Sequence, residues 1–453
     1  MRGIWILALA ALFASPAAGP AAAGPAAAGQ VTLRLWSRAD RSGPLRAGNI
    51  VSAGKVLNEQ LAAEGASVRV SVSVHESTAK GYDADALDLL KAFAVGKGPD
   101  LYVAAHEWIG AFAESGYAWN LEAHIARRPE YYAGVIPVLW EACKFKGARY
   151  AVPQDTEVRM FFYRKDMLRK IGKPAAFIES LPARVGRGEF TIWDLSRLAK
   201  EVVDAGAAKY GLIHRPNVGP DWLMSMASFG FDPFDEKTAR LQASRSALTG
   251  YLRWIEWNVR NGVTPRNNTS MSWDTVRSLM PSGRAFLFHY GVWDVKAQLK
   301  LGLGPGEKAY FEKVGWLHSP PAKKGGAPVN LSHPIVYAVN PRSKRRELAA
   351  RLVGIATQPR FNNRHAVATG HLPVNRGQAG TPAFREAWVL RAAAPLLARS
   401  IFMPNHANIG QFNRIIYKGI QGVETGRLSA EEGAAFVIGE LQAEFGEGVK
   451  ILE

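Results

Sequence analysis

Three side chains suited to polar contacts and ring stacking stand together at His106, Glu107 and Trp108. They follow an apolar stretch, 101–104, that predicts a strand, and they lie where the next helix should begin. Open α/β sheets bind their ligands at the carboxyl ends of strands. An indole stacks on the face of a sugar ring, while an imidazole and a carboxylate form hydrogen bonds with hydroxyl groups. The cluster therefore predicts a carbohydrate-binding site.

The segments around this cluster alternate between strand and helix patterns. Apolar and polar residues alternate over 31–35 and 68–74, which predicts strands, whereas 51–64 and 87–93 carry apolar residues at helical spacing. Such an alternation is typical of a mostly parallel sheet that helices cover on both faces.

The second half of the chain repeats this alternation. Further strands are predicted at 161–163, 210–213, 285–288, 314–317 and 335–339, and helices at 251–259, 273–280, 347–356 and 430–445. Thr191 with Asp194 and Ser429 with Glu432 each form the pattern of a capping box at a helix start. The Gly-, Pro- and Lys-rich stretch 320–328 is expected to be a surface loop.

The first 29 residues have the character of a signal peptide. Arg2 is followed by an apolar run over 4–13 and by a stretch of small residues over 14–29, with cleavage expected near Ala28. No later segment offers about 20 unbroken apolar residues, so no membrane span is expected. The rest, 30–453, is long enough for two lobes of about 200 residues each.

The charge and the cysteine content narrow the class of protein. The net charge is +17, but the basic residues are dispersed, and no nucleic-acid-binding motif is present, so we expect no nucleic-acid partner. The densest basic group is 342–346. Cys143 is the only cysteine, which excludes an intrachain disulfide, and its apolar neighbours predict a buried thiol with no catalytic role.

Four segments in a fixed order carry a family resemblance. They are Gly96-Lys97-Gly98-Pro99-Asp100 with Ala105-His106-Glu107-Trp108, Tyr150-Ala151-Val152-Pro153 with Glu157, Ser282-Gly283-Arg284-Ala285-Phe286 with Gly291-Val292-Trp293, and Met403-Pro404-Asn405. Together they resemble the family 1 extracellular solute-binding proteins of bacterial ABC sugar importers, the maltose-binding protein group. The resemblance extends over nearly all of the chain after the signal peptide.

The resemblance implies an α/β fold of the type II periplasmic-binding-protein kind, with two mostly parallel sheets, helices on both faces and three hinge crossings. Lobe 1 is expected at 30–154 plus 337–372, and lobe 2 at 158–332 plus 375–453. The crossings are expected at 153–157, 332–336 and 372–374. Short crossings of this kind bend while both cores stay packed.

The resemblance also implies which residues contact the ligand. Asp40 and Arg41 match a charged pair on sugar hydroxyls, Glu107 matches a ligand-contacting acid, and Trp293 matches a stacking tryptophan. The other ligand-binding candidates are His106, Trp108, Glu157, Trp222, Tyr290, Asp294, His333, Asn413 and Arg414.

Structural interpretations stand beside several of these assignments. The pair at 40–41 also suits a solvated turn, His106 suits a packed helix start, and Trp222 suits a core position. Asp155 and Arg159, which flank Glu157, could form a purely structural ion pair.

Two departures from the family pattern concern stacking groups. The maltose-binding proteins carry adjacent Trp-Tyr where this chain has Asn413-Arg414, and the tryptophan before their His-acid pair is Ala104 here. The changes indicate a sugar other than maltodextrin, or a different pose of the ligand.

These expectations describe a periplasmic substrate-binding protein of an ABC importer that captures a di- or oligosaccharide of α-glucoside type. It would deliver this ligand to the transmembrane permease subunits and would be a monomer. We expect no enzymatic activity, catalytic residue, cofactor or metal. Two alternatives remain open: a non-sugar solute such as a polyamine, oligopeptide or phosphodiester, and a glycoside hydrolase that uses Glu107 and Glu157.

Overall fold

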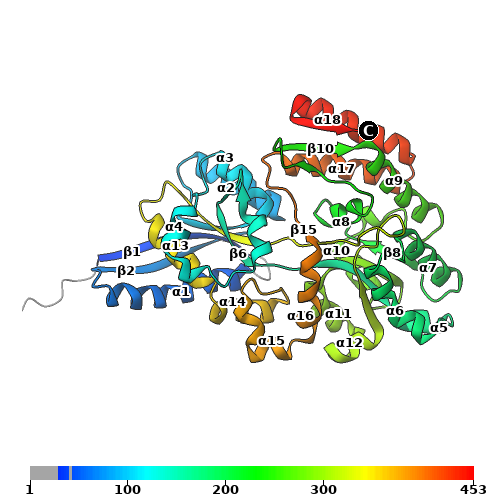
Figure 1. The fold of residues 1–453 in the computed structure, drawn as a ribbon, viewed down its shortest axis with the longest axis horizontal. Helices are drawn as coiled ribbons and strands as arrows, with labels where there is room; N and C mark the ends of the chain where they lie inside the picture. Colours follow the sequence, from blue (N-terminus) through cyan, green and yellow to red (C-terminus); the bar gives the residue numbers. More distant parts are fainter. Residues whose placement is uncertain (1–28, 40–42) are drawn as a thin grey trace, which may run out of the picture.

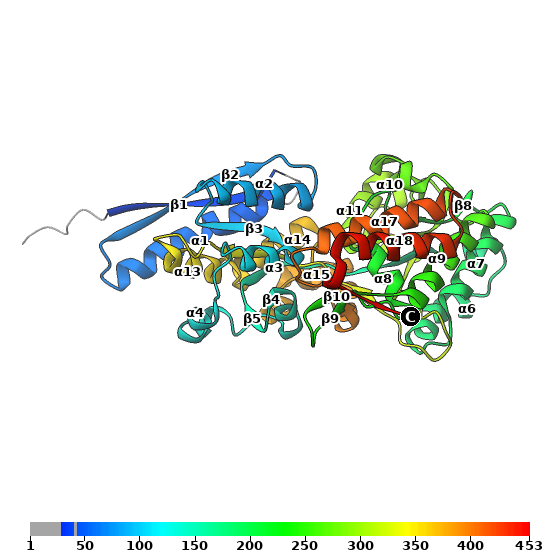
Figure 2. The same cartoon turned by 90° about the horizontal axis from the view of Figure 1, so that it is seen from above.

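Two lobes lie side by side in the computed structural model, which describes residues 29–39 and 43–453. Figure 1 shows the chain passing between them, and Figure 2 shows the same separation from above. Residues 1–28 of the expected signal peptide and the candidates Asp40 and Arg41 lie outside the described residues, whereas Gly29 already belongs to a strand. Within the described ranges, every helix is too short or too polar to cross a bilayer.

The sheet of lobe 1 has the strand order β2-β1-β3-β14-β6. The strands are β1 (Gly29–Arg38), β2 (Val68–Ser77), β3 (Leu101–Ala105), β6 (Ala151–Asp155) and β14 (Ile335–Val339). β1 is parallel to β2 and β3, whereas β14 is antiparallel to β3 and β6. Four strands therefore run in one direction, and the exception is the strand that arrives from the other lobe.

Helices cover both faces of this sheet (Figure 1). They are α1 (Gly43–Ala63), α2 (Tyr82–Ala94), η1 (His106–Trp108), α3 (Ile109–Glu114), α4 (Glu122–Arg127), η2 (Pro129–Tyr131), η3 (Pro137–Cys143), α13 (Arg346–Ala356) and α14 (Pro359–Thr369). A short hairpin, β4 (Lys144–Phe145) and β5 (Ala148–Arg149), follows η3. One apolar core, drawn from residues 31–152 and 335–356, fills this lobe. Cys143 is buried in it as a free thiol, as expected.

The sheet of lobe 2 has the order β15-β13-β7-β11-β8, and β12 also pairs with β7. The strands are β7 (Arg159–Arg164), β8 (Tyr210–His214), β11 (Ala285–Gly291), β12 (Val314–Leu317), β13 (Asn330–Leu331) and β15 (Ser400–Ile401). Only β7 runs against the others, because it continues directly from β6 across the first crossing. The expectation of two mostly parallel sheets is therefore confirmed, with one reversed strand in each.

Two apolar cores lie against this second sheet. The helices are α5 (Lys165–Lys170), α6 (Ala175–Gly186), α7 (Ile192–Asp204), α8 (Asp221–Ala227), α9 (Arg245–Arg260), η4 (Asn268–Ser270), α10 (Trp273–Leu279), η5 (Val292–Asp294), α11 (Val295–Gln298), η6 (Leu299–Leu303), α12 (Glu307–Lys313), η7 (Arg376–Gly380), α15 (Pro382–Glu386), α16 (Trp388–Ala393), η8 (Ala394–Arg399), α17 (Ile409–Glu424), α18 (Ala430–Phe445) and η9 (Gly446–Gly448). The capping boxes at the starts of α7 and α18 are both present. A small sheet joins β9 (Phe234–Asp235), β10 (Arg240–Ser244) and β16 (Val449–Leu452).

The three passages between the lobes touch one another. Thr156, just after β6, exchanges backbone hydrogen bonds with Leu372, and its hydroxyl lies 2.5 Å from that of Ser332. Because β6 ends at this junction, the strands parallel to it also end facing lobe 2. β11 ends beside the first residue of β7, since Gly291 pairs with Arg159. The carboxyl ends of both sheets therefore meet between the lobes.

Candidate functional site

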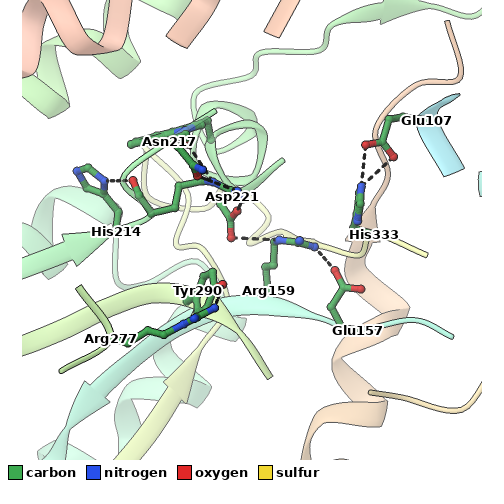
Figure 3. Close-up of polar contacts among 11 residues, drawn as sticks. Glu107, Glu157, Arg159, His214, Asn217, Asp221, Arg277, Tyr290 and His333 are labelled. Atoms are coloured by element: carbon green, nitrogen blue, oxygen red, sulfur yellow. Dashed lines mark hydrogen bonds and ion pairs between the residues drawn. The ribbon is translucent and has the colours of Figure 1, made fainter. Parts of the chain in front are cut away.

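Arg159, the first residue of β7, is the centre of a charged network between the lobes (Figure 3). Its Nε donates to Asp221 Oδ1 at 3.1 Å, and its Nη1 donates to Glu157. Its guanidinium carbon lies 4.7 Å from the centroid of the Trp293 ring. Arg159 is only 5% exposed, so these contacts replace water around its charge.

The two carboxyl groups that share Arg159 differ in how well they are neutralised. Asp221 also accepts from Arg215, and although burial opposes ionisation, the two guanidinium groups hold its pKa well below the usual range. Among the described residues, Arg159 is the one cationic side chain that forms an ion pair with Glu157. Burial, reinforced by Asp155 and Asp221, raises the pKa of Glu157 to about 7 despite the attraction of Arg159. Glu157 is therefore the less well neutralised of these two carboxyl groups.

The indole of Trp293 lies across the α-carbon of Gly291. A Cβ atom added to Gly291 would stand 1.6 Å from Trp293 Cζ3, so only glycine permits this position of the ring. Tyr290 meets the indole edge to face, with ring centroids 4.8 Å apart. Trp293 stays half-buried, which leaves part of the indole accessible.

Arg277 contacts two further candidates, Tyr290 and Asp294, which lie beside Trp293. It donates from Nη2 to the Tyr290 hydroxyl at 3.3 Å, and its Nε lies 3.4 Å from Asp294 Oδ1. Asp294 also accepts from Gln298 and is buried. These contacts hold Tyr290 and Asp294 in place, and Tyr290 in turn packs against the indole of Trp293.

On the side of lobe 1, η1 begins where β3 ends and presents His106, Glu107 and Trp108. His333, from the second crossing, lies 2.8 Å by its Nε2 from the Glu107 carboxylate (Figure 3). Although burial opposes ionisation, His333 and His106 lower the pKa of Glu107 to about 2. Burial lowers the pKa of His106 to about 4, against the attraction of Glu107.

Trp108 lies between the two lobes and contacts both of them. Its Nε1 donates to Asp83 Oδ1 at 3.1 Å, and a Cβ atom on Gly410 of α17 would lie 3.2 Å from its Cζ2. The indole is buried. In this structure Trp108 therefore packs α17 of lobe 2 against lobe 1.

The remaining candidates lie around this centre. Trp222 is buried in the core of lobe 2, where its Nε1 donates to the Asn217 carbonyl at 3.1 Å. On α17, Arg414 is exposed and donates to Gln411, while Asn413 is half-buried.

The Asp155–Arg159 pair that the sequence left open is not formed, because Asp155 points into lobe 1. There its carboxylate accepts from Arg46 Nη2 at 2.8 Å and lies 2.5 Å from His365 Nε2. Sequence reasoning also missed Asp221, Arg215 and Arg277 as members of the charged network. Asp221 stands 62 residues from Arg159, and no local pattern signals that pairing.

Within the part of the chain that the structure describes, two groups of side chains have the ligand types and spacing for a metal ion. They are His106, Glu107 and His333, and Asp155, His365 and His371. In each group the potential ligand atoms lie within 4.8 Å of one another. The first group belongs to the site just described, and the second lies behind it in lobe 1.

Comparisons with known proteins agree with this architecture. The model of the bacterial extracellular solute-binding protein family matches residues 51–361. The maltotriose-binding protein of Pyrococcus abyssi is 23% identical over 339 residues, which is 73% of this chain and 66% of that protein, slightly less than two thirds of its length.

Solved structures show the same fold. The GacH receptor of Streptomyces glaucescens GLA.O, known unliganded and with acarbose, superposes with a TM-score of 0.70 at 17% identity, covering 92% of this chain and 98% of the receptor. Maltose-bound MalE3 of T. maritima gives a TM-score of 0.69 at 18% identity, covering 91% and 99%.

Proposed function

Since the chain belongs to the bacterial extracellular solute-binding protein family, we propose that it is the periplasmic binding component of an ABC importer. Its ligand in this proposal is a di- or oligosaccharide of α-glucoside type, bound between the lobes. The binding named for the Pyrococcus and Streptomyces relatives, maltotriose and acarbose, favours this class of ligand.

The observation that carries the proposal is the Glu157–Arg159–Asp221 network beside the half-buried indole of Trp293. Sugar hydroxyl groups both donate and accept hydrogen bonds, so they match carboxylates and a guanidinium equally well. Hydrogen bonds to charged partners are about twice as strong as neutral ones. The indole face complements the apolar face of a pyranose ring.

The proposed cycle has three steps. The lobes separate by bending at the short crossings, a sugar enters between them, and closure removes it from water. A wrong ligand would leave these buried charged groups unpaired, which is the source of discrimination in such sites. The closed form then delivers the sugar to the transmembrane subunits of the permease. Asn413 and Arg414, in place of aromatic residues, support a sugar other than maltodextrin.

A hydrolytic role for Glu107 and Glu157 is disfavoured in this proposal. A glycosidase needs two carboxyl groups that face one glycosidic bond, one of them free to protonate it. Here Glu107 is paired with His333 and Glu157 with Arg159, and membership of a family of binding proteins outweighs the raised pKa of Glu157, which alone would suit an acid. Incubation with the oligosaccharides that bind in the screen described below, and an assay for new reducing ends, tests this, with no increase expected.

The proposal is tested by a thermal-shift screen against mono-, di- and oligosaccharides, with spermidine as a non-sugar control. A ligand at 100 times its dissociation constant stabilises by about 2.7 kcal/mol, enough for a clear shift. Trp293→Ala should then lower the affinity at least tenfold by calorimetry, while Trp388→Ala, at an exposed tryptophan of α16, should not. A shift with spermidine alone, or equal affinities for both variants and the wild type, would contradict the proposal.

A further inference from the structure

The imidazole of His106 faces an oxygen atom with each of its ring nitrogens. Its Nδ1 lies 3.2 Å from the Pro334 carbonyl oxygen, and its Nε2 lies 3.1 Å from that of Met403. The side chain is fully buried. A neutral imidazole has one N–H group. One ring nitrogen therefore directs a lone pair at a carbonyl oxygen unless a positive centre lies between them.

The carboxylate of Glu107 adds a further electron-rich atom at the same place. Its Oε2 is buried and lies 3.4 Å from His106 Nδ1; His333 Nε2 lies 2.8 Å from both carboxylate oxygens, and its hydrogen bond goes to Oε1. Two ring nitrogens, a carboxylate oxygen and a carbonyl oxygen thus converge around one point.

The second candidate cluster, around Asp155, contains a permanent cation beside its carboxylate. At Asp155, the guanidinium of Arg46 donates from Nε at 2.9 Å and from Nη2 at 2.8 Å. That cluster already contains its cation. Among the described residues, by contrast, the ion-pair partners of the Glu107 carboxylate are imidazoles, and no lysine or arginine pairs with it.

We propose that His106, Glu107 and His333 bind a divalent transition-metal ion, for which Zn²⁺ is the best match. Two imidazoles and a carboxylate are a ligand set that Zn²⁺ prefers. Zn–N and Zn–O bonds of about 2.1 Å place tetrahedral ligand atoms about 3.4 Å apart. The separations of 3.4 Å and 2.8 Å from Glu107 Oε2 to His106 Nδ1 and His333 Nε2 need only small adjustments to meet that value.

The surroundings of His106 also suit a metal ligand. A ligating histidine usually donates its other N–H to a carbonyl or carboxylate, which fixes the ring. With Nδ1 on the metal, Nε2–H donates to Met403 in this way. The ion ties the end of β3 to the second crossing, and the bond to Met403 extends that tie to the segment before α17.

The test is a calorimetric titration of the EDTA-treated, sugar-free protein with Zn²⁺ at about pH 7.5, together with Co²⁺ absorption. We expect one ion per chain, the visible bands of tetrahedral Co²⁺, and a raised unfolding temperature. Glu107→Gln and His333→Gln should each weaken Zn²⁺ binding by at least about tenfold. Circular dichroism checks that each variant folds, and either one that folds is sufficient for the test.

Two histidine variants serve as matched controls. His124 forms a His–Glu pair of similar length, 3.0 Å from Glu347, but belongs to neither candidate metal group among the described residues. His365 belongs to the second cluster. His124→Gln and His365→Gln should both bind Zn²⁺ like the wild type.

No binding, or binding that persists in both Glu107→Gln and His333→Gln, overturns the proposal. With no binding, the two carbonyl contacts of His106 are structural, and loss of binding in His365→Gln assigns the ion to the other cluster. Because the titration needs no sugar, its outcome is independent of the proposed transport function.

Discussion

Gly291→Ala should displace Trp293 without disturbing the backbone of β11. The φ of Gly291 is −119°, an extended conformation that alanine adopts freely. The new methyl carbon, however, would stand 1.6 Å from Cζ3 and 2.0 Å from Cη2 of Trp293. Carbon atoms in contact lie about 3.5–4.0 Å apart, so the indole must move by about 2 Å.

The cost of this displacement follows from the contacts that the indole makes. Adding a methyl group to a packed site costs about 1–3 kcal/mol. Loss of the Arg159 guanidinium from the ring face contributes up to about 2 kcal/mol of this. In the proposed site, an indole displaced from the sugar should lower affinity about tenfold. Gly439, in α18, has open space around it, so Gly439→Ala should be neutral or stabilise by up to about 1 kcal/mol.

Urea unfolding of a double-mutant cycle provides the assay. Trp293→Ala removes the obstacle, so adding Gly291→Ala to it should cost almost nothing. The cycle should thus show a coupling of about 1–3 kcal/mol between the two positions. Additive free energies, or a Gly291→Ala protein as stable as Gly439→Ala, would refute the steric reasoning irrespective of any ligand.

Three further predictions concern the buried side chains Arg46, Trp222 and Glu157. Arg46→Met removes the guanidinium partner of the buried Asp155 carboxylate and should lower the free energy of unfolding in urea by about 3–5 kcal/mol. Lys450→Met, at an exposed ion pair, should lower it by less than about 1 kcal/mol. Trp222→Phe should lower the unfolding temperature but leave sugar affinity within about twofold in calorimetry, because this ring lies in the core. The pKa of Glu157, raised by burial to about 7, means that the folded state holds its proton more tightly than the unfolded state. Stability should therefore fall by about 2–3 kcal/mol between pH 5 and pH 8, and Glu157→Gln should lack that share of the slope.

Local patterns were sufficient for most of the regular structure. The strict alternation over 68–74 became β2, and the predicted strand 335–339 matches β14. Both capping boxes begin the helices expected of them. The short strands β13, β15 and β16 were not predicted, because two to four residues carry too little periodicity and pair only through distant segments. The two-lobed fold itself came from the order of family motifs and is confirmed by the solved relatives.

The site was less accessible to sequence reasoning, because its partners are distant in the chain. His333 and Glu107 lie 226 residues apart, yet their side chains lie within hydrogen-bond distance. Trp108 looked suited to stacking, but its surroundings depend on Asp83 and on α17, which no motif links to it. Arg159 was visible only as a neighbour of Glu157. Its role emerges once Asp221 and Trp293 are brought to it by separate elements.

The reversed strand β14 has a consequence for folding. It lies between β3 and β6, so the first sheet stays split until residues 335–339 are in place. Ile335 pairs with Ala105, about 230 residues away, and contacts of such long sequence separation are slow to form. Lobe 1 therefore keeps open sheet edges until the chain has returned from lobe 2.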